Sequence, residues 1–305
     1  MSGKHLKLLA GVVAALLAFW GITALLPSRT DRASADFRIP RVAVDSVTTI
    51  TITTPVDTIA LARAANRGAW TVNGLAASRA KVEDLIGTFG EPVRPELVAH
   101  SRTSFARLGV DSTASRRLRV FDRQRVLVDL IVSAKGVGFE GTFVRLPGDS
   151  AVYSWSGRLG ELVRRTFDDW RDNVIAQVTT DSVRRIDVTR GARRYSLTRN
   201  GGRWFLAGTP ADSGATVRLV DAFKTVTASG FPTRAQLDSA FRPKDRIERH
   251  VALYGNAGAP LLALDFDSTS GAFWVRRAGN ETIYRLNSWE ADQLTPADST
   301  LRKHN

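Results

Sequence analysis

Cysteine is absent from this sequence, and histidine is scarce. Without cysteine, the chain has no disulfide bonds, no thiol nucleophile, no thiolate metal site and no lipid attached to a processed cysteine. The four histidines, His5, His100, His250 and His304, do not follow the spacing of a metal-binding motif. The sequence also lacks a Gly-x-Ser-x-Gly nucleophile elbow and a glycine-rich phosphate loop ending in Lys-Ser or Lys-Thr. We therefore expect no catalytic residues, no cofactor and no metal, and we predict that the protein is not an enzyme.

Lysine is scarce as well, so arginine supplies most of the formal net charge of +13. Such a charge is compatible with an anionic partner, which could be lipid headgroups, a cell-wall polymer or nucleic acid. The arginine pairs are spread along the chain, at positions 116–117, 164–165, 184–185, 193–194 and 276–277. Because they do not gather into one basic tract, we interpret them as a solvated surface and expect no nucleic-acid partner.

An uninterrupted apolar run, from Leu8 to Leu26, lies near the amino end. It carries no charge, and as a helix it would span roughly 28 Å, close to the hydrocarbon thickness of a bilayer. Lys4 and Lys7 precede the run and favour a cytoplasmic amino end. We predict a single-pass protein of the cell membrane that contacts the lipid bilayer through Leu8 to Leu26, with an extracytoplasmic carboxyl-terminal body.

A cleaved secretory signal is the alternative to this anchor, because Ala33-Ser34-Ala35 has the small-x-small form of a cleavage site. The apolar run is longer than a usual signal core, and cleavage near Ala35 would fall far beyond its end. Both observations favour an uncleaved signal anchor. We assign residues 1–27 to a cytoplasmic tail and transmembrane anchor, and residues 28–44 to a linker.

The body of the chain carries one ordered pattern twice. Each copy begins with Asp-Ser-Val and continues with alternating strand-like segments, a turn before a tryptophan, an amphipathic helix and a meander of short strands. The repeated helical pattern aligns Val82 with Leu219. The matched segments are Asp45–Val47 with Asp181–Val183, Trp70 with Trp204, Val82–Phe89 with Leu219–Val226, Val126–Val132 with Leu262–Phe266, and Val152–Tyr153 with Ile283–Tyr284.

This pattern predicts an α+β fold, in which an N-terminal transmembrane helix precedes two tandem repeats, each a mostly antiparallel sheet with covering helices. The first repeat spans residues 45–173 and the second spans residues 181–297, while residues 298–305 form a polar tail. In the second copy, Asn287 and Glu290 have the spacing of a capping box at the start of the closing helix.

Two pairs of matching residues could in principle serve a function. Asp129 and Asp265 could form a carboxylate pair across the repeat, but both lie on the polar side of a strand, so we expect them to face outward. Trp70 and Trp204 could stack on sugar rings, but duplicated aromatic residues after a tight turn are more often part of a core.

The ordered motifs resemble the bacterial domain of unknown function 4340 family, over most of the chain after Val44. The segments that carry the resemblance are Val47–Ile50, Gly68–Trp70, Gly202–Trp204, Leu108–Asp111, Val144–Arg145, Val152–Tyr153 and Trp170–Asp172. Members commonly pair two such halves behind one amino-terminal membrane segment. The family's Gly-Leu-x-x-Pro stretch appears here as Gly109-Val110-Asp111-Ser112, without the proline. The resemblance implies an envelope protein of undetermined activity, often associated with gliding-motility-type ABC transporter systems.

The richest acidic group surrounds a tryptophan and comprises Asp168, Asp169, Trp170, Arg171 and Asp172. As a functional site, it would contact a partner or a divalent cation. As a structural feature, it would be a helix end at which Arg171 pairs with a neighbouring carboxylate and Trp170 packs. Exposed charge clusters are usually solvated, so the structural interpretation is favoured.

Three functions are compatible with these features. The favoured one is a non-enzymatic, membrane-anchored envelope protein that binds a partner, as an accessory of a gliding-motility-type ABC transporter system and its subunits. The alternative is a module that binds cell-wall or surface polysaccharide through exposed tryptophan and arginine. The least favoured is a hydrolase with an unrecognised site, which would need clustered polar residues in one cleft.

Overall fold

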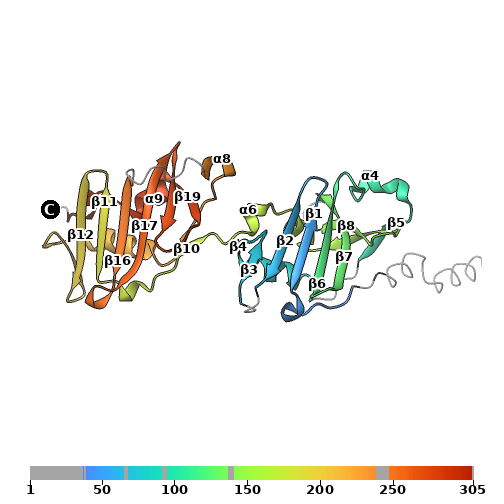
Figure 1. Cartoon of the computed structure of the whole chain (residues 1–305), viewed down its shortest axis with the longest axis horizontal. Coiled ribbons are helices and arrows are strands. Elements are labelled where there is room, and N and C mark those ends of the chain that lie inside the picture. The colour runs from blue at the N-terminus through green and yellow to red at the C-terminus, as the bar shows by residue number, and fades with distance from the viewer. Residues whose placement is uncertain are drawn as a thin grey trace, which may run out of the picture. The chain divides into compact units, whose positions relative to one another are not determined.

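The chain folds into two compact units, Met1–Arg171 (unit 1) and Asp172–Asn305 (unit 2) (Figure 1). A computed structural model describes residues 37, 39–64, 68–90, 95–136, 141–237 and 247–303. The predicted anchor, Leu8 to Leu26, lies outside these residues. Within the described ranges, no helix is both long enough and apolar enough to cross a bilayer.

The described part of unit 1 contains a nine-stranded antiparallel sheet in the order β4-β3-β2-β1-β6-β7-β8-β9-β5. In β1, Ile50 and Ile52 are buried and alternate with threonines, because successive side chains of a strand point to opposite faces. The strands are β1 (Thr49–Thr53), β2 (Thr58–Arg63), β3 (Trp70–Val72), β4 (Leu75–Ala77), β5 (Glu96–Ala99), β6 (Ser115–Asp122), β7 (Arg125–Gly136), β8 (Gly141–Arg145) and β9 (Val152–Ser156).

Three helices cover the inner face of this sheet: α3 (Arg79–Gly87), α5 (Leu159–Val163) and α6 (Phe167–Trp170). Their buried side chains, among them Leu85 and Trp170, join the inward side chains of the strands in one core. Figure 1 shows β2, β1 and β6 with no helix in front of them. Unit 1 is therefore a sheet with its core on one side.

A short segment covers part of the outer face of the same sheet. It contains η2 (Arg102–Ser104) and α4 (Phe105–Leu108), and its Leu108 and Val110 pack with Val152 of β9 in a separate apolar cluster. The outer face is thus covered toward β7, β8 and β9. Over β2, β1 and β6, none of the described helices covers it (Figure 1).

The described part of unit 2 contains an eight-stranded antiparallel sheet in the order β14-β13-β12-β11-β16-β17-β18-β19, and a two-stranded sheet of β10 with β15. The strands are β10 (Val174–Ala176), β11 (Arg185–Arg190), β12 (Arg193–Asn200), β13 (Arg203–Leu206), β14 (Thr209–Pro210), β15 (Val226–Thr227), β16 (Arg249–Tyr254), β17 (Pro260–Thr269), β18 (Ala272–Arg277) and β19 (Ile283–Asn287). The predicted mixed α+β class with mostly antiparallel sheets is confirmed.

The core of unit 2 is formed by its sheet together with two helices and a closing turn. Asn287 caps α9 as predicted: its side chain accepts a bond from the Glu290 amide, and the Glu290 carboxylate accepts one from the Asn287 amide, both at 2.9 Å. The helical elements are η3 (Thr180–Ser182), α7 (Ser213–Ala222), α8 (Arg234–Leu237), η4 (Asn256–Gly258), α9 (Ser288–Leu294) and η5 (Asp298–Leu301); unit 1 also has η1 (Val44–Ser46).

One backbone contact recurs in the two units and fixes which residues correspond. Ser78 is the N-cap of α3, and its amide donates to the carbonyl of Trp170 at 2.9 Å. Asp212 is the N-cap of α7, and its amide donates to the carbonyl of Leu301, also at 2.9 Å. Leu301 of unit 2 therefore holds the place that Trp170 holds in unit 1.

The same caps correct the sequence alignment of the two helices. Counted from each N-cap, Leu85 of α3 corresponds to Leu219 of α7, whereas the sequence pattern paired Val82 with Leu219. Phe89 and Phe223 agree with the corrected register, since the carbonyl of each accepts a backbone bond from an upstream segment. An apolar stripe repeats every turn, so a slip of one turn leaves the pattern nearly unchanged.

The predicted linker and the predicted polar tail both contain buried residues. In the predicted linker, Phe37 and Val42 are buried in the core of unit 1. In the predicted polar tail, Leu301 is 1% exposed and Asp298 pairs with Arg302 at 2.8 Å. Both segments carry isolated apolar residues, which have no periodic pattern and become informative only once a core is present.

Candidate functional site

Helix α6 holds the middle of the predicted acidic site. The amide and the hydroxyl of Thr166 both donate to Oδ2 of Asp169, at 2.8 and 2.7 Å. These bonds, the hydroxyl bond above all, hold the pKa of the Asp169 carboxyl below its ordinary value. The carboxylate of Asp169 is therefore engaged at the start of its own helix.

Trp170 is fully buried rather than presented to solvent. The guanidinium of Arg165 lies over its ring, 5.3 Å from the centroid. The indole nitrogen Nε1 is buried and has no hydrogen-bond partner among the described residues, which is a cost to the folded state. The ring packs as the structural interpretation expected.

The remaining candidate residues make local contacts. Arg171 pairs with Asp168 at 3.2 Å and lies 5.9 Å from the centroid of the Phe167 ring. Asp172 accepts a bond from the amide of Val174 at 3.1 Å. In the described ranges, no three His, Asp or Glu side chains gather in a way that could hold a metal ion. A partner contact through the exposed Asp168 carboxylate stays a prediction.

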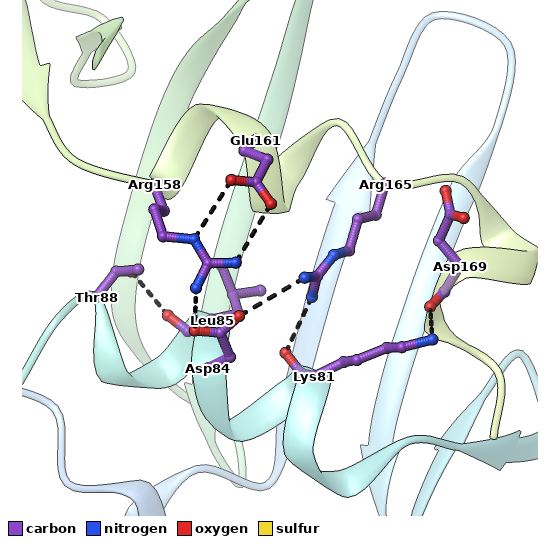
Figure 2. Close-up of polar contacts among 8 residues, drawn as sticks. All are labelled: Lys81, Asp84, Leu85, Thr88, Arg158, Glu161, Arg165 and Asp169. Carbon is purple, nitrogen blue, oxygen red and sulfur yellow. Dashed lines mark hydrogen bonds and ion pairs between the residues drawn. The ribbon is translucent and has the colours of Figure 1, made fainter. Parts of the chain in front are cut away.

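Beside this group, a network of charged side chains joins α3 to the segment from Arg158 to Asp169; Figure 2 shows it. We call it the clasp. Arg158 pairs with Asp84 of α3 at 3.2 Å, and Arg165 approaches the same carboxylate at 3.6 Å. Lys81 of α3 donates to the carbonyl of Asp169 at 2.7 Å. The clasp thus fastens α3 to α5 and α6.

Most contacts of the clasp have no recognisable pattern in the sequence. Arg158 and Glu161 have the i, i+3 spacing of a helical ion pair, and they do pair at 3.3 Å. The contacts of Asp84 with Arg158 and of Lys81 with Asp169 join residues far apart in the chain, and only the tertiary fold brings them together.

The two matching aspartates lie on the outer sheet faces, as predicted. In unit 1, both Asp129 carboxylate oxygens accept bonds from Arg117, at 2.9 and 2.7 Å. In unit 2, Asp265 contacts Nδ1 of His250 at 2.8 Å and Arg276 at 3.3 Å. Each carboxylate is therefore neutralised within its own sheet.

The open part of the outer face in unit 1 carries an arginine that has no polar partner in the part of the chain that the structure describes. Arg119 lies beside Phe121, with its guanidinium carbon 5.6 Å from the ring centroid, and its Nε is buried without a hydrogen bond. The hydroxyl of Thr51, on the neighbouring strand, is buried and unpartnered as well. Asp129 is the cross-strand neighbour of Arg119, but its carboxylate is engaged by Arg117.

The tryptophans divide between core and surface. Trp70 is 2% exposed, so its predicted place in the core is confirmed. Trp204 is half-buried and packs against the core of unit 2. Trp289, on α9, is 67% exposed, and no sequence pattern distinguished it from the others.

A pocket of about 410 Å³ lies on the helix side of unit 2, between α7 and the stretch from α9 to η5. Its volume falls in the range of small-ligand and side-chain pockets. Residues that line it include Ala215, Arg218, Leu219, Ala222, Pro296 and Leu301.

These features define an α+β protein with two helix-backed antiparallel sheets, an open outer face in unit 1 and a pocket in unit 2. A family model described as domain of unknown function (DUF4340) matches residues 70–245, more than half of the chain. The chain belongs to this family. No curated protein and no solved structure matches the sequence significantly.

Proposed function

We propose that the chain is a non-enzymatic, membrane-anchored envelope protein that binds a partner protein, as an accessory of a gliding-motility-type ABC transporter system. The run Leu8 to Leu26 would hold it in the membrane, with both units outside the cytoplasm. The transporter association rests on the family resemblance.

The open outer face of unit 1 carries the partner-binding part of this proposal. Arg119 has no ion pair or hydrogen bond among the described residues, and the buried Thr51 hydroxyl beside it is unsatisfied. A buried polar group without a partner is costly, about 1–3 kcal/mol, unless another molecule satisfies it. A docking protein that supplies a carboxylate and a hydrogen-bond acceptor would relieve both groups.

Site-specific photocrosslinking in the native host tests this docking surface. A photoreactive amino acid replaces Thr49 on the open face, and a control replaces Arg79, which lies on α3 at the helix side. We expect the first position to crosslink to a permease subunit of an ABC transporter, identified by mass spectrometry, and the second not to. Equal crosslinking from both positions, or none to a transporter subunit from Thr49, would contradict the proposal.

A matched pair of charge reversals sharpens the test. Arg119→Glu should lower the yield of that crosslink by about tenfold, because it replaces the unpaired guanidinium with a like charge for an acidic partner. Arg125→Glu makes the same charge change at an exposed position on the adjacent strand and should leave the yield unchanged.

The membrane topology needs its own measurement. Alkaline phosphatase fused after Asn305 is active only outside the cytoplasm of a bacterial host, so we expect an active fusion. An inactive fusion would reverse the proposed orientation, while a free, soluble mature chain beginning near Ala35 would rule out the anchor.

Trp289 supports polysaccharide binding as a second candidate function. Its ring is 67% exposed, and an exposed indole offers an apolar face on which a sugar ring can stack. Binding of the chain to insoluble cell-wall material should then fall several-fold in Trp289→Ala. Val217→Ala, which removes another exposed apolar side chain of unit 2, is the control.

We also propose that the two units are copies of one ancestral module. The strand order 4-3-2-1-6-7-8-9 of unit 1 and the order 14-13-12-11-16-17-18-19 of unit 2 describe the same connections. The recurring contact between N-cap and closing segment supports the same view. A relative that contains a single unit and folds alone would strengthen it.

A further inference from the structure

The pocket of unit 2 lies where unit 1 is filled by its own chain. Trp170 occupies this place in unit 1, and the smaller Leu301 replaces it in unit 2. Counted from the N-caps, Lys81 of the clasp corresponds to Ala215. Two large side chains have thus been exchanged for small ones at the same junction, where the pocket of about 410 Å³ lies.

The charge at this junction is also reversed. Asp84, which is gripped by Arg158 and Arg165 in unit 1, corresponds to Arg218 in unit 2. Among the described residues, Arg218 has neither an ion pair nor a hydrogen bond. The facing side of the pocket offers no carboxylate, since its lining residues are Gln293, Pro296, Thr300 and Leu301.

We propose that this pocket binds a segment of a partner protein that inserts a large apolar side chain, such as tryptophan, beside a carboxylate that pairs with Arg218. The apolar part of the segment would lie over Leu219, Ala222 and Leu301, as Trp170 lies in the core of unit 1. This inference rests on the proposed partner-binding function. It adds the pocket of unit 2 as a second binding surface, besides the open outer face of unit 1.

Asp221 also lines the pocket, one turn from Arg218. It is exposed, and it has no ion pair in the described ranges. A free amino acid could use both charges, with its carboxylate on Arg218 and its ammonium on Asp221. A segment within a protein has no ammonium at this point, so the two kinds of ligand can be told apart.

The probe is N-acetyl-5-fluorotryptophan, which carries an indole and a carboxylate without an ammonium. Its binding to the full-length chain in lipid nanodiscs is measured by fluorine NMR line broadening, with empty nanodiscs as the blank. We expect millimolar binding, about three- to fivefold tighter than that of the corresponding amide, because a partly exposed ion pair contributes modestly.

Pocket-filling variants test the location. Leu301→Trp should place an indole in the pocket, as Trp170 does in unit 1, and reduce probe binding at least tenfold. Ala222→Leu fills the pocket from α7 and should also reduce probe binding at least tenfold. It serves as the test if Leu301→Trp folds poorly. Val217→Trp adds an indole at a 54% exposed position of the same helix, and probe binding should stay at the wild-type level.

Arg218→Gln tests the charge: the preference for the acid over the amide should vanish, whereas Arg234→Gln on α8 should preserve it.

Several results would overturn the proposal. They are no probe binding, unchanged binding in both pocket-filling variants, an acid preference that survives Arg218→Gln, and tighter binding of free 5-fluorotryptophan than of its N-acetyl form. Probe binding without the Thr49 crosslink would retain the pocket and reject the transporter proposal alone.

Discussion

Replacing Trp170 separates two opposing contributions of one side chain. Its ring is fully buried in the core of unit 1, but its Nε1–H is buried and finds no hydrogen-bond partner within the described ranges. Trp170→Ala removes both the favourable packing and the unfavourable polar group. Trp170→Phe removes the polar group and keeps most of the packing.

The expected magnitudes differ clearly. Truncation of a buried tryptophan to alanine costs about 3–5 kcal/mol. For phenylalanine, the smaller ring forgoes about 1 kcal/mol of burial, while release of the unsatisfied N–H returns about 1–3 kcal/mol. We therefore expect Trp170→Ala to destabilise unit 1 by about 2 kcal/mol, and Trp170→Phe to leave its stability unchanged or to raise it by up to about 2 kcal/mol.

Native-state hydrogen exchange, read by mass spectrometry, measures these changes unit by unit. Peptides from β1 and β6 report on unit 1, and peptides from β11 and β16 in the same sample are the internal reference. If Trp170→Phe destabilises unit 1 as much as Trp170→Ala does, the indole N–H is satisfied in the folded protein and the reasoning fails. A change confined to unit 2 would also contradict it.

Further predictions concern caps and ionisation. Thr166→Ala should lower the stability of unit 1 by about 1 kcal/mol, and Asn287→Ala should lower that of unit 2 by about the same. Hydrogen exchange should change only in the unit that carries the substitution. Because folding lowers the pKa of Asp169, its carboxylate stabilises unit 1 above its ordinary pKa of about 4, and this stability is lost as the pH falls through the lowered value. Asp169→Asn should make the stability of unit 1 less sensitive to acid, and an identical acid response would contradict this. Burial raises the pKa of Tyr195, whose hydroxyl donates to the Pro296 carbonyl at 2.6 Å, so Tyr195→Phe should leave the ultraviolet titration of the tyrosines unchanged near pH 10.

The two units differ at the junction between the capped helix and the closing segment. In unit 1, the clasp and Trp170 close the space between the helix and the final segment. In unit 2, Arg218 and Leu301 leave the corresponding space open. Because each position differs by a substitution within the same backbone framework, a partner site can form without any change in strand order.

The alternation of apolar and polar residues was the sequence pattern that predicted the strands most reliably. Ile50 and Ile52, or Leu264 and Phe266, alternate with polar residues and are buried in their sheets. The short-range pattern of Asn287 and Glu290 was equally reliable, since a capping box depends on residues three apart. Such features are encoded locally, and a single sequence is sufficient to recognise them.

The helix register was harder to derive, and the clasp was harder still. A stripe of apolar residues on α7 fits two registers one turn apart, and only the contact of Asp212 with Leu301 selects between them. The charged side chains of Asp84 and Arg165 have no sequence pattern that pairs them, because their distance in the chain carries no geometric information.

The sequence by itself determined that this chain alternates short strands with a few amphipathic helices, lacks thiol chemistry and begins with a bilayer-length apolar run. Hydrophobic periodicity and composition are local properties, so they survive without knowledge of the fold. Tertiary structure alone decided that Trp170 packs in a core, that Arg119 has no polar partner among the described residues, and that Leu301 borders a pocket. Satisfaction of a charge and filling of a volume depend on residues brought together from distant parts of the chain, and no local pattern specifies them.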